Sequence, residues 1–123
     1  MDMNVEILTM EWIEKILCVD FMGREVLREQ INHAYISFSQ HHEYISIKFH
    51  MRENVPKFPY SIRVPVSLLA WQKNQIPINF LLHVKNGFID ELEIVAMDLQ
   101  EIDASNIDLS NIEYDIDKSL RLM

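Results

Sequence analysis

The sequence predicts an α+β domain in which an N-terminal helix pair packs on an antiparallel meander sheet of about four to six strands. Two changes along the chain indicate this class. Apolar residues recur every three or four positions before Ala34 and every second position after it. Short segments rich in polar residues or proline separate the alternating runs. A chain of 123 residues, 49% of them apolar, can bury one core without disulfides.

The two helices follow from apolar residues at helical spacing. The first is predicted over residues 10–18, with Thr9 as its N-cap. A break, Asp20-Phe21-Met22-Gly23, follows it. The second helix is predicted over residues 24–32, with either end of the break as its cap. The residues expected to face the core are Leu8, Trp12, Ile13, Ile16, Leu17, Val26, Leu27 and Ile31.

Alternation predicts the first strands. Residues 35–39 and 44–50 alternate apolar and polar side chains, which is typical of strands with one buried face. Residues 51–60 contain two prolines and are expected to form a loop, because proline has no N–H to donate to a ladder. A third strand is predicted over residues 62–72, with Pro65 at an edge or a bulge.

The stretch NFLLHVKNGFIDELEI, residues 79–94, predicts a hairpin around Asn86-Gly87. A two-residue turn, with Lys85 opposite Phe88, would place Glu91 and Glu93 on the apolar face, at a cost of several kcal/mol each if they were buried (order of magnitude). A three-residue loop, Lys85-Asn86-Gly87, with a bulge at the glycine avoids this cost. We therefore predict the three-residue loop.

That register divides the hairpin residues between two faces. Val84 lies opposite Phe88, and Asp90 is the one carboxylate left on the apolar face. The predicted core face carries Phe80, Leu82, Val84, Phe88, Leu92 and Ile94, and the other face carries Leu81, His83, Ile89, Glu91 and Glu93.

Charge is unevenly distributed along the chain. Residues 1–85 hold nine acidic and nine basic residues, whereas residues 86–123 hold ten acidic residues and only Lys118 and Arg121, so the net charge of −8 lies in the last third. Such an end repels phosphate backbones, which makes nucleic-acid binding unfavourable, and it attracts a basic protein partner. Solubility alone is the simpler explanation of the same acids.

The predicted domain covers residues 1–98, and residues 99–123 form an acidic tail that is partly docked. Alternation of Ile112, Tyr114 and Ile116 favours a short extra strand in this tail. A tail that waits for a partner is an equally open alternative.

Compartment and membrane contact are indicated by what the sequence lacks. Cys18 is its single cysteine, which suits a reducing compartment and a small buried apolar role. No run of about 18 apolar residues exists, and the first residues are acidic rather than basic. We expect a cytoplasmic protein without membrane contact.

Few residues in this sequence are candidates for catalysis, ligand binding or metal binding. His83 and Glu91 are predicted neighbours that could exchange protons, but no nucleophile accompanies them, so a solvated cross-strand pair is the simpler interpretation. With Glu93 and Asp90 they are the candidate binding residues, and no catalytic residue is assigned. A metal site from His41, His42, Glu43 and His50 is unfavourable, because adjacent strand residues point to opposite faces. We predict no metal and no cofactor.

Several motifs resemble a family of small bacterial proteins of unknown function. They are Asp20-Phe21-Met22-Gly23, Leu27 with Gln30, Arg63-Val64-Pro65-Val66, and the LLHV…G…ELEI hairpin between Leu81 and Ile94. The likeness spans about residues 9–98. Met22 stands where the family pattern suggests proline. The resemblance implies an architecture and no catalytic residues; some small acidic proteins of this kind are immunity partners of secreted toxins.

Three functions follow, in decreasing order of preference. The first is a non-enzymatic interaction module, of immunity or adaptor type, that binds a basic partner through the outer hairpin face and the acidic tail. The second is an enzyme or small-ligand binder that uses His83 and Glu91. The third is a homo-oligomer, such as a homodimer, formed by pairing of exposed strand edges.

Overall fold

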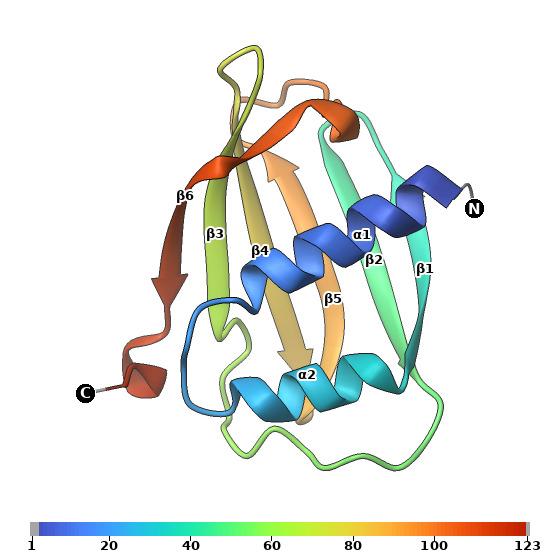
Figure 1. Ribbon diagram of the computed structural model, residues 1–123, viewed down its shortest axis with the longest axis vertical. Helices are drawn as coiled ribbons and strands as arrows, with labels where there is room; N and C mark the ends of the chain where they lie inside the picture. Colours follow the sequence, from blue (N-terminus) through green and yellow to red (C-terminus); the bar gives the residue numbers. More distant parts are fainter. Residues whose placement is uncertain (1–2, 123) are drawn as a thin grey trace.

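The computed structural model describes residues 3–122, which contain two α-helices and one six-stranded antiparallel sheet (Figure 1). This confirms the predicted α+β class. Two short 3₁₀ turns, η1 (Ala104–Asn106) and η2 (Lys118–Leu120), flank the last strand. The helices and strands are α1 (Met3–Ile16), α2 (Arg24–Asn32), β1 (Ala34–Gln40), β2 (Tyr44–Met51), β3 (Val66–Gln72), β4 (Pro77–Lys85), β5 (Phe88–Ala96) and β6 (Ile107–Ile116).

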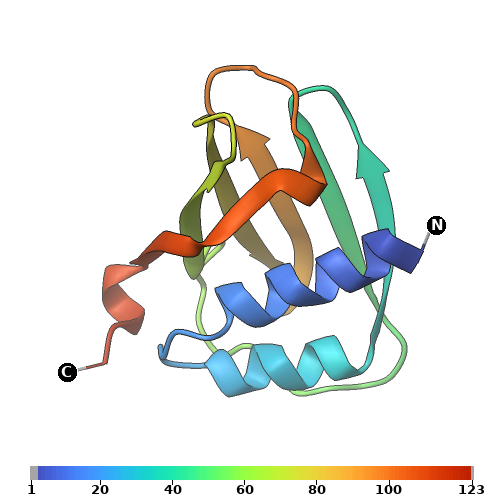
Figure 2. The same cartoon turned by 45° about the horizontal axis from the view of Figure 1, so that its top comes forward.

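Both helices lie on the same face of the sheet (Figures 1 and 2). The core fills the space between the two layers, where Trp12 of α1 meets Phe80 of β4 edge to face, with ring centroids 5.8 Å apart. The helical stripe was predicted correctly: Trp12, Ile13, Ile16, Leu17 and Leu27 are buried, and Leu8, Val26 and Ile31 are partly buried.

The strand order is β1-β2-β5-β4-β3-β6. The predicted meander is therefore interrupted between β2 and β3, because β2 pairs with β5 rather than with the next strand. The connection, residues 52–65, crosses the end of the sheet at the β4–β5 turn (Figure 1). The predicted third strand began too early, since the ladder of β3 starts at Val66, directly after Pro65.

The predicted three-residue hairpin loop is wrong. Lys85 pairs with Phe88, so the turn has only two residues, Asn86 and Gly87. Both adopt left-handed φ angles, 54° and 84°, which is the conformation of a type I′ turn. A loop with a bulge at the glycine would place only Gly87 in that region, so the φ angle of Asn86 excludes it.

A bulge at Asp90, and not the hairpin loop, keeps Glu91 and Glu93 off the apolar face. Val84 pairs with Ile89 and His83 with Glu91, which leaves Asp90 as an extra residue in β5. Alternation therefore slips by one position inside the strand. Ile89 enters the core instead of Phe88, which corrects the predicted face of these two residues, whereas Leu92 and Ile94 are buried as predicted.

Two details of the helical region differ from the prediction. Helix α1 begins at Met3, so Thr9 lies inside the helix, fully buried, and is not its N-cap. Cys18 is exposed rather than buried, because it lies beyond the last turn of α1. Helix α2 has the predicted bounds, and its N-cap is Gly23, whose φ of 87° favours glycine.

The acidic end of the chain contains a strand where alternation predicted a short one, but β6 begins at Ile107 and has 10 residues. β6 pairs with β3 along one edge of the sheet. The Tyr114 hydroxyl of β6 donates a hydrogen bond to the Lys15 carbonyl of α1. Beyond the strand, Leu120 is fully buried, and its carbonyl accepts from the Met22 N–H at a distance of 2.9 Å. The Asp-Phe-Met-Gly break thus receives the C-terminal segment.

Two buried glutamines fasten loops to the two ends of the sheet. Gln30 of α2 donates to the carbonyls of Pro56 and Gly87, both at 2.9 Å, and accepts from the Ile89 N–H at 2.8 Å. Gln72 of β3 accepts from the Asp103 N–H at 2.8 Å. Gln30 therefore joins a helix, a loop and the hairpin next to the bulge.

Candidate functional site

The candidate site is the face of the sheet opposite α1 and α2, which we call the open face. The strands alternate buried and half-buried residues, so every second side chain points to this face. On it, four half-buried apolar side chains lie around Asn79 on β3, β4 and β5, and we call this group the outer strip. It consists of Leu69, Trp71, Leu81 and Val95.

The predicted partners His83 and Glu91 are opposite each other in the ladder, but their side chains do not pair. His83 Nε2 lies 3.0 Å from Glu93 Oε1. Glu91 instead accepts a hydrogen bond from the Ser46 hydroxyl and lies 3.5 Å from the Lys48 ammonium. The structure thus brings all of these groups onto one face, with Glu93 rather than Glu91 as the histidine's partner.

Asp90 is explained by the bulge. As the extra residue it does not point into the core, and its side chain is 30% exposed. Its carboxylate lies 3.8 Å from the Lys48 ammonium. Lys48 therefore forms ion pairs with two carboxylates, those of Asp90 and Glu91. Half-exposed ion pairs of this kind contribute about 1 kcal/mol or less to the free energy of unfolding.

Ser46, His83 and Glu91 do not form a connected set of hydrogen bonds along which a proton could move. The Ser46 hydroxyl donates to Glu91 and not to a histidine. Ser46 lies on β2 and His83 on β4, with β5 between them, so two strand spacings of about 4.8 Å separate them. A carboxylate can only accept a hydrogen bond, so His83 Nε2 carries a proton and donates it to Glu93. Nδ1 of His83 is buried without a partner among the described residues.

Sequence reasoning missed a hollow beside Trp71, at the β3–β6 edge of the open face. It has a volume of about 440 Å³, and Asp108, Glu113 and Lys73 contribute to its lining. Hydrogen bonds from the hydroxyl and N–H of Ser110 lower the pKa of Asp108, so this carboxylate stays ionised. Alternation along β3 could have indicated this apolar surface. Leu69 and Trp71 alternate with buried apolar residues, so β3 is apolar on both faces.

Two of the histidines considered for a metal site, His41 and His50, have other partners. His41 stacks on Tyr44, with ring centroids 4.2 Å apart, and its Nε2 lies 2.9 Å from the Ser39 hydroxyl. His50 stacks on Tyr35 across the β1–β2 ladder. Within residues 3–122, no three side chains of the metal-binding types converge on a point that could hold an ion.

Comparison with known proteins gives no relative: no family model, no curated protein and no solved structure matches this chain. No helix in the described part of the chain has the length and apolar character needed to cross a membrane.

Proposed function

We propose that this protein is a non-enzymatic interaction module, of immunity or adaptor type, that binds a basic protein partner through its open face. The observation that carries the proposal is the outer strip with carboxylates beside it. Glu93 is the ladder neighbour of Leu81, Glu113 is that of Leu69, and Asp108 is that of Trp71. Apolar anchors within a charged rim are typical of protein interfaces.

Charge favours a basic partner. The whole net charge of −8 arises after residue 85, and β5 and β6 place part of it on the open face. A field of one sign speeds association with a partner of opposite sign and makes it sensitive to salt. The exposed thiol of Cys18 suits a reducing compartment, so we place the interaction in the cytoplasm.

The hollow beside Trp71 suits a lysine or arginine side chain of the partner. An aromatic ring attracts a cation over its face, and the two carboxylates that line the same hollow, Asp108 and Glu113, outnumber its one cation, Lys73. We assign this hollow the role of anchor, because aromatic and charged groups that meet in a depression produce the largest binding contributions in interfaces.

An enzyme that uses His83 and Glu91 is less well supported. These two side chains have different partners, and each contact is explained by the ladder. A homo-oligomer remains a second arrangement, because β1 and β6 are edge strands of the sheet. Sedimentation at increasing concentration distinguishes it: a monomer at every concentration removes this arrangement.

Charge-neutralising variants test the proposal. The open-face variant carries Glu93→Gln, Glu113→Gln and Asp115→Asn, where Asp115 is the ladder neighbour of Ser67 on the same face. The immobilised wild-type protein is used to capture proteins from its host extract, and the open-face variant is expected to lose a basic partner that the wild type retains at low salt and releases at high salt. Deletion of residues 99–123 is a poorer test, because it would remove β6 and the buried Leu120.

A matched control variant carries Glu6→Gln, Glu11→Gln and Glu14→Gln. These exposed residues lie on α1, so the control changes the net charge equally on the opposite side of the molecule. It is expected to retain the partner. Equal capture by the wild type, the open-face variant and the control would contradict the proposal.

A further inference from the structure

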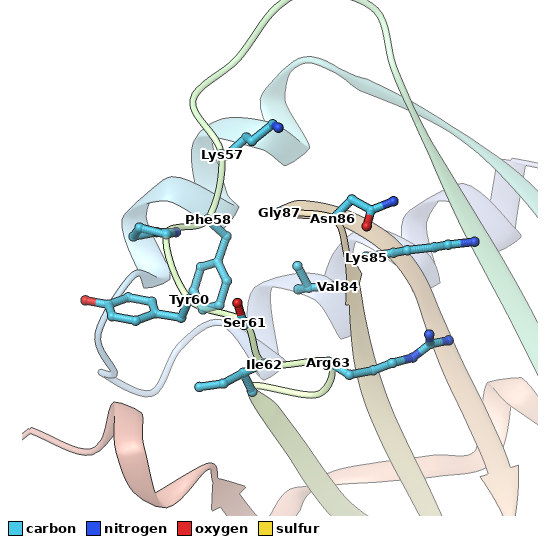
Figure 3. A pocket seen from close by; sticks show the side chains of 11 residues that line it. Lys57, Phe58, Tyr60, Ser61, Ile62, Arg63, Val84, Lys85, Asn86 and Gly87 are labelled. Atoms are coloured by element: carbon cyan, nitrogen blue, oxygen red, sulfur yellow. The ribbon is translucent and has the colours of Figure 1, made fainter.

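A second hollow lies at the hairpin end of the sheet, between residues 57–63 and the β4–β5 turn (Figure 3). Its volume is about 670 Å³. Three of its lining residues are cations, namely Lys57, Arg63 and Lys85, and none is a carboxylate. The lining thus offers cations and no acid, in a protein whose net charge is −8.

The walls of this hollow are fixed by hydrogen bonds. The Phe58 N–H donates to the Gly87 carbonyl at 2.8 Å, and the Val84 N–H donates to the Arg63 carbonyl at 2.7 Å. The segment is thus attached to the hairpin at both ends. Gln30 donates to the same Gly87 carbonyl, so the turn is held in place from the helix side as well. A framework of this kind needs little reorganisation on binding.

The cations of the hollow have no acidic partner within the structure. No ion pair among the described residues includes Lys57, Arg63 or Lys85. The Lys57 ammonium lies 5.7 Å from the centroid of the Phe88 ring. Figure 3 shows the Arg63 and Lys85 side chains extending in the same direction, with the Asn86 amide on that side of the hairpin.

Arg63 and Lys85 extend on the same side of the hairpin (Figure 3), and cations without an acidic partner attract an oxyanion. A guanidinium presents paired donors that match a phosphate or a carboxylate, and a lysine adds a point charge. Val84 and Ile62 give the hollow an apolar part. We propose that it binds a small organic oxyanion, a phosphate or a carboxylate on a compact apolar body.

The size of the ligand follows from the charge of the rest of the molecule. A polyanion would extend over neighbouring surfaces, and the adjacent open face carries Asp90, Glu91 and Glu93. Repulsion from these carboxylates disfavours a long nucleic acid and permits a ligand with a single charged group. The site is separate from the proposed anchor beside Trp71, which has a different lining.

The test is a titration of the ¹⁵N-labelled protein with phenyl phosphate, followed by amide chemical shifts. Saturable shifts are expected at Ser61, Arg63, Lys85 and Asn86. Benzoate and inorganic phosphate, titrated in parallel, distinguish a carboxylate from a phosphate preference and measure the contribution of the apolar body. Phenol is the uncharged control, and equal binding of phenol would overturn the proposal.

A double variant, Arg63→Gln with Lys85→Gln, is expected to bind the best of these probes about tenfold more weakly or worse, since a charge-assisted hydrogen bond is lost. The matched control is Arg28→Gln with Lys118→Gln, which removes one exposed arginine and one exposed lysine elsewhere and is expected to bind normally. Unsaturable shifts, or equal affinity in the double variant and the wild type, would refute the site.

Discussion

The two faces of the sheet are built from the same strands and have opposite properties. On the helix side of β4, Ile78, Phe80 and Leu82 are fully buried. The alternate residues of β4, Asn79, Leu81 and His83, are half-buried and point to the open face, where a partner could contact them. One face therefore holds the fold together, and the other can change without unfolding it. A substitution should lower stability on the first and binding on the second.

Among single substitutions, the largest difference in stability is expected between neighbours on β4. Phe80→Ala should lower the free energy of unfolding by about 3–5 kcal/mol, because it opens a cavity under Trp12. Leu81→Ala, one residue further on the open face, should cost about 1 kcal/mol. Urea unfolding of both variants measures the difference, and similar losses would mean that the two faces do not divide these roles.

A smaller loss is expected for the buried polar contacts of the helix side. Gln30→Leu should cost about 1–3 kcal/mol, because the Ile89 N–H and the Pro56 carbonyl lose their partner, whereas the Gly87 carbonyl keeps the Phe58 N–H. Gln72→Leu should cost less, since the two bonds that its amide donates are longer, 3.2 and 3.3 Å. Thermal or urea unfolding ranks the pair. The reverse order would mean that the hairpin end is the less constrained one.

The bulge predicts that two single-residue deletions in β5 have very different effects on folding. Removing Asp90 leaves Val84 opposite Ile89 and His83 opposite Glu91 in a regular ladder, so it should cost only about 1 kcal/mol. Removing Glu93 shifts every following side chain to the other face and should prevent folding. Circular dichroism and amide spectra check both. Loss of the fold on removal of Asp90 would contradict this account of the register.

The smallest effect concerns pH. Burial raises the pKa of Tyr114, and the nearby Cys18 raises it further. A group with a raised pKa contributes stability below its unfolded value, near ~10, and loses that contribution as the pH rises through the folded value. Wild-type stability should therefore fall above about pH 10, and Tyr114→Phe should show a shallower decline. An unchanged slope would mean that this phenol does not titrate differently on folding.

Periodicity alone determined much of the fold. The spacing of the apolar residues predicted both helices, the alternating strands and the side of the sheet on which Leu92 and Ile94 lie. It also placed His83, Glu91 and Glu93 together on the other face. These predictions succeed because the 3.6- and 2-residue periods are local properties that follow from backbone geometry.

Only the tertiary structure decided the strand order, the pairing of the hairpin side chains and the position of the slipped residue. The sequence shows that β5 contains one residue too many for regular alternation, but the turn and the strand could both absorb it. The structure places it at Asp90, where Lys48 of β2 meets its carboxylate and Gln30 of α2 binds the neighbouring Ile89 N–H. Those partners are distant in sequence, so no local pattern could reveal them. The hollows beside Trp71 and Arg63 depend on such long-range contacts for the same reason.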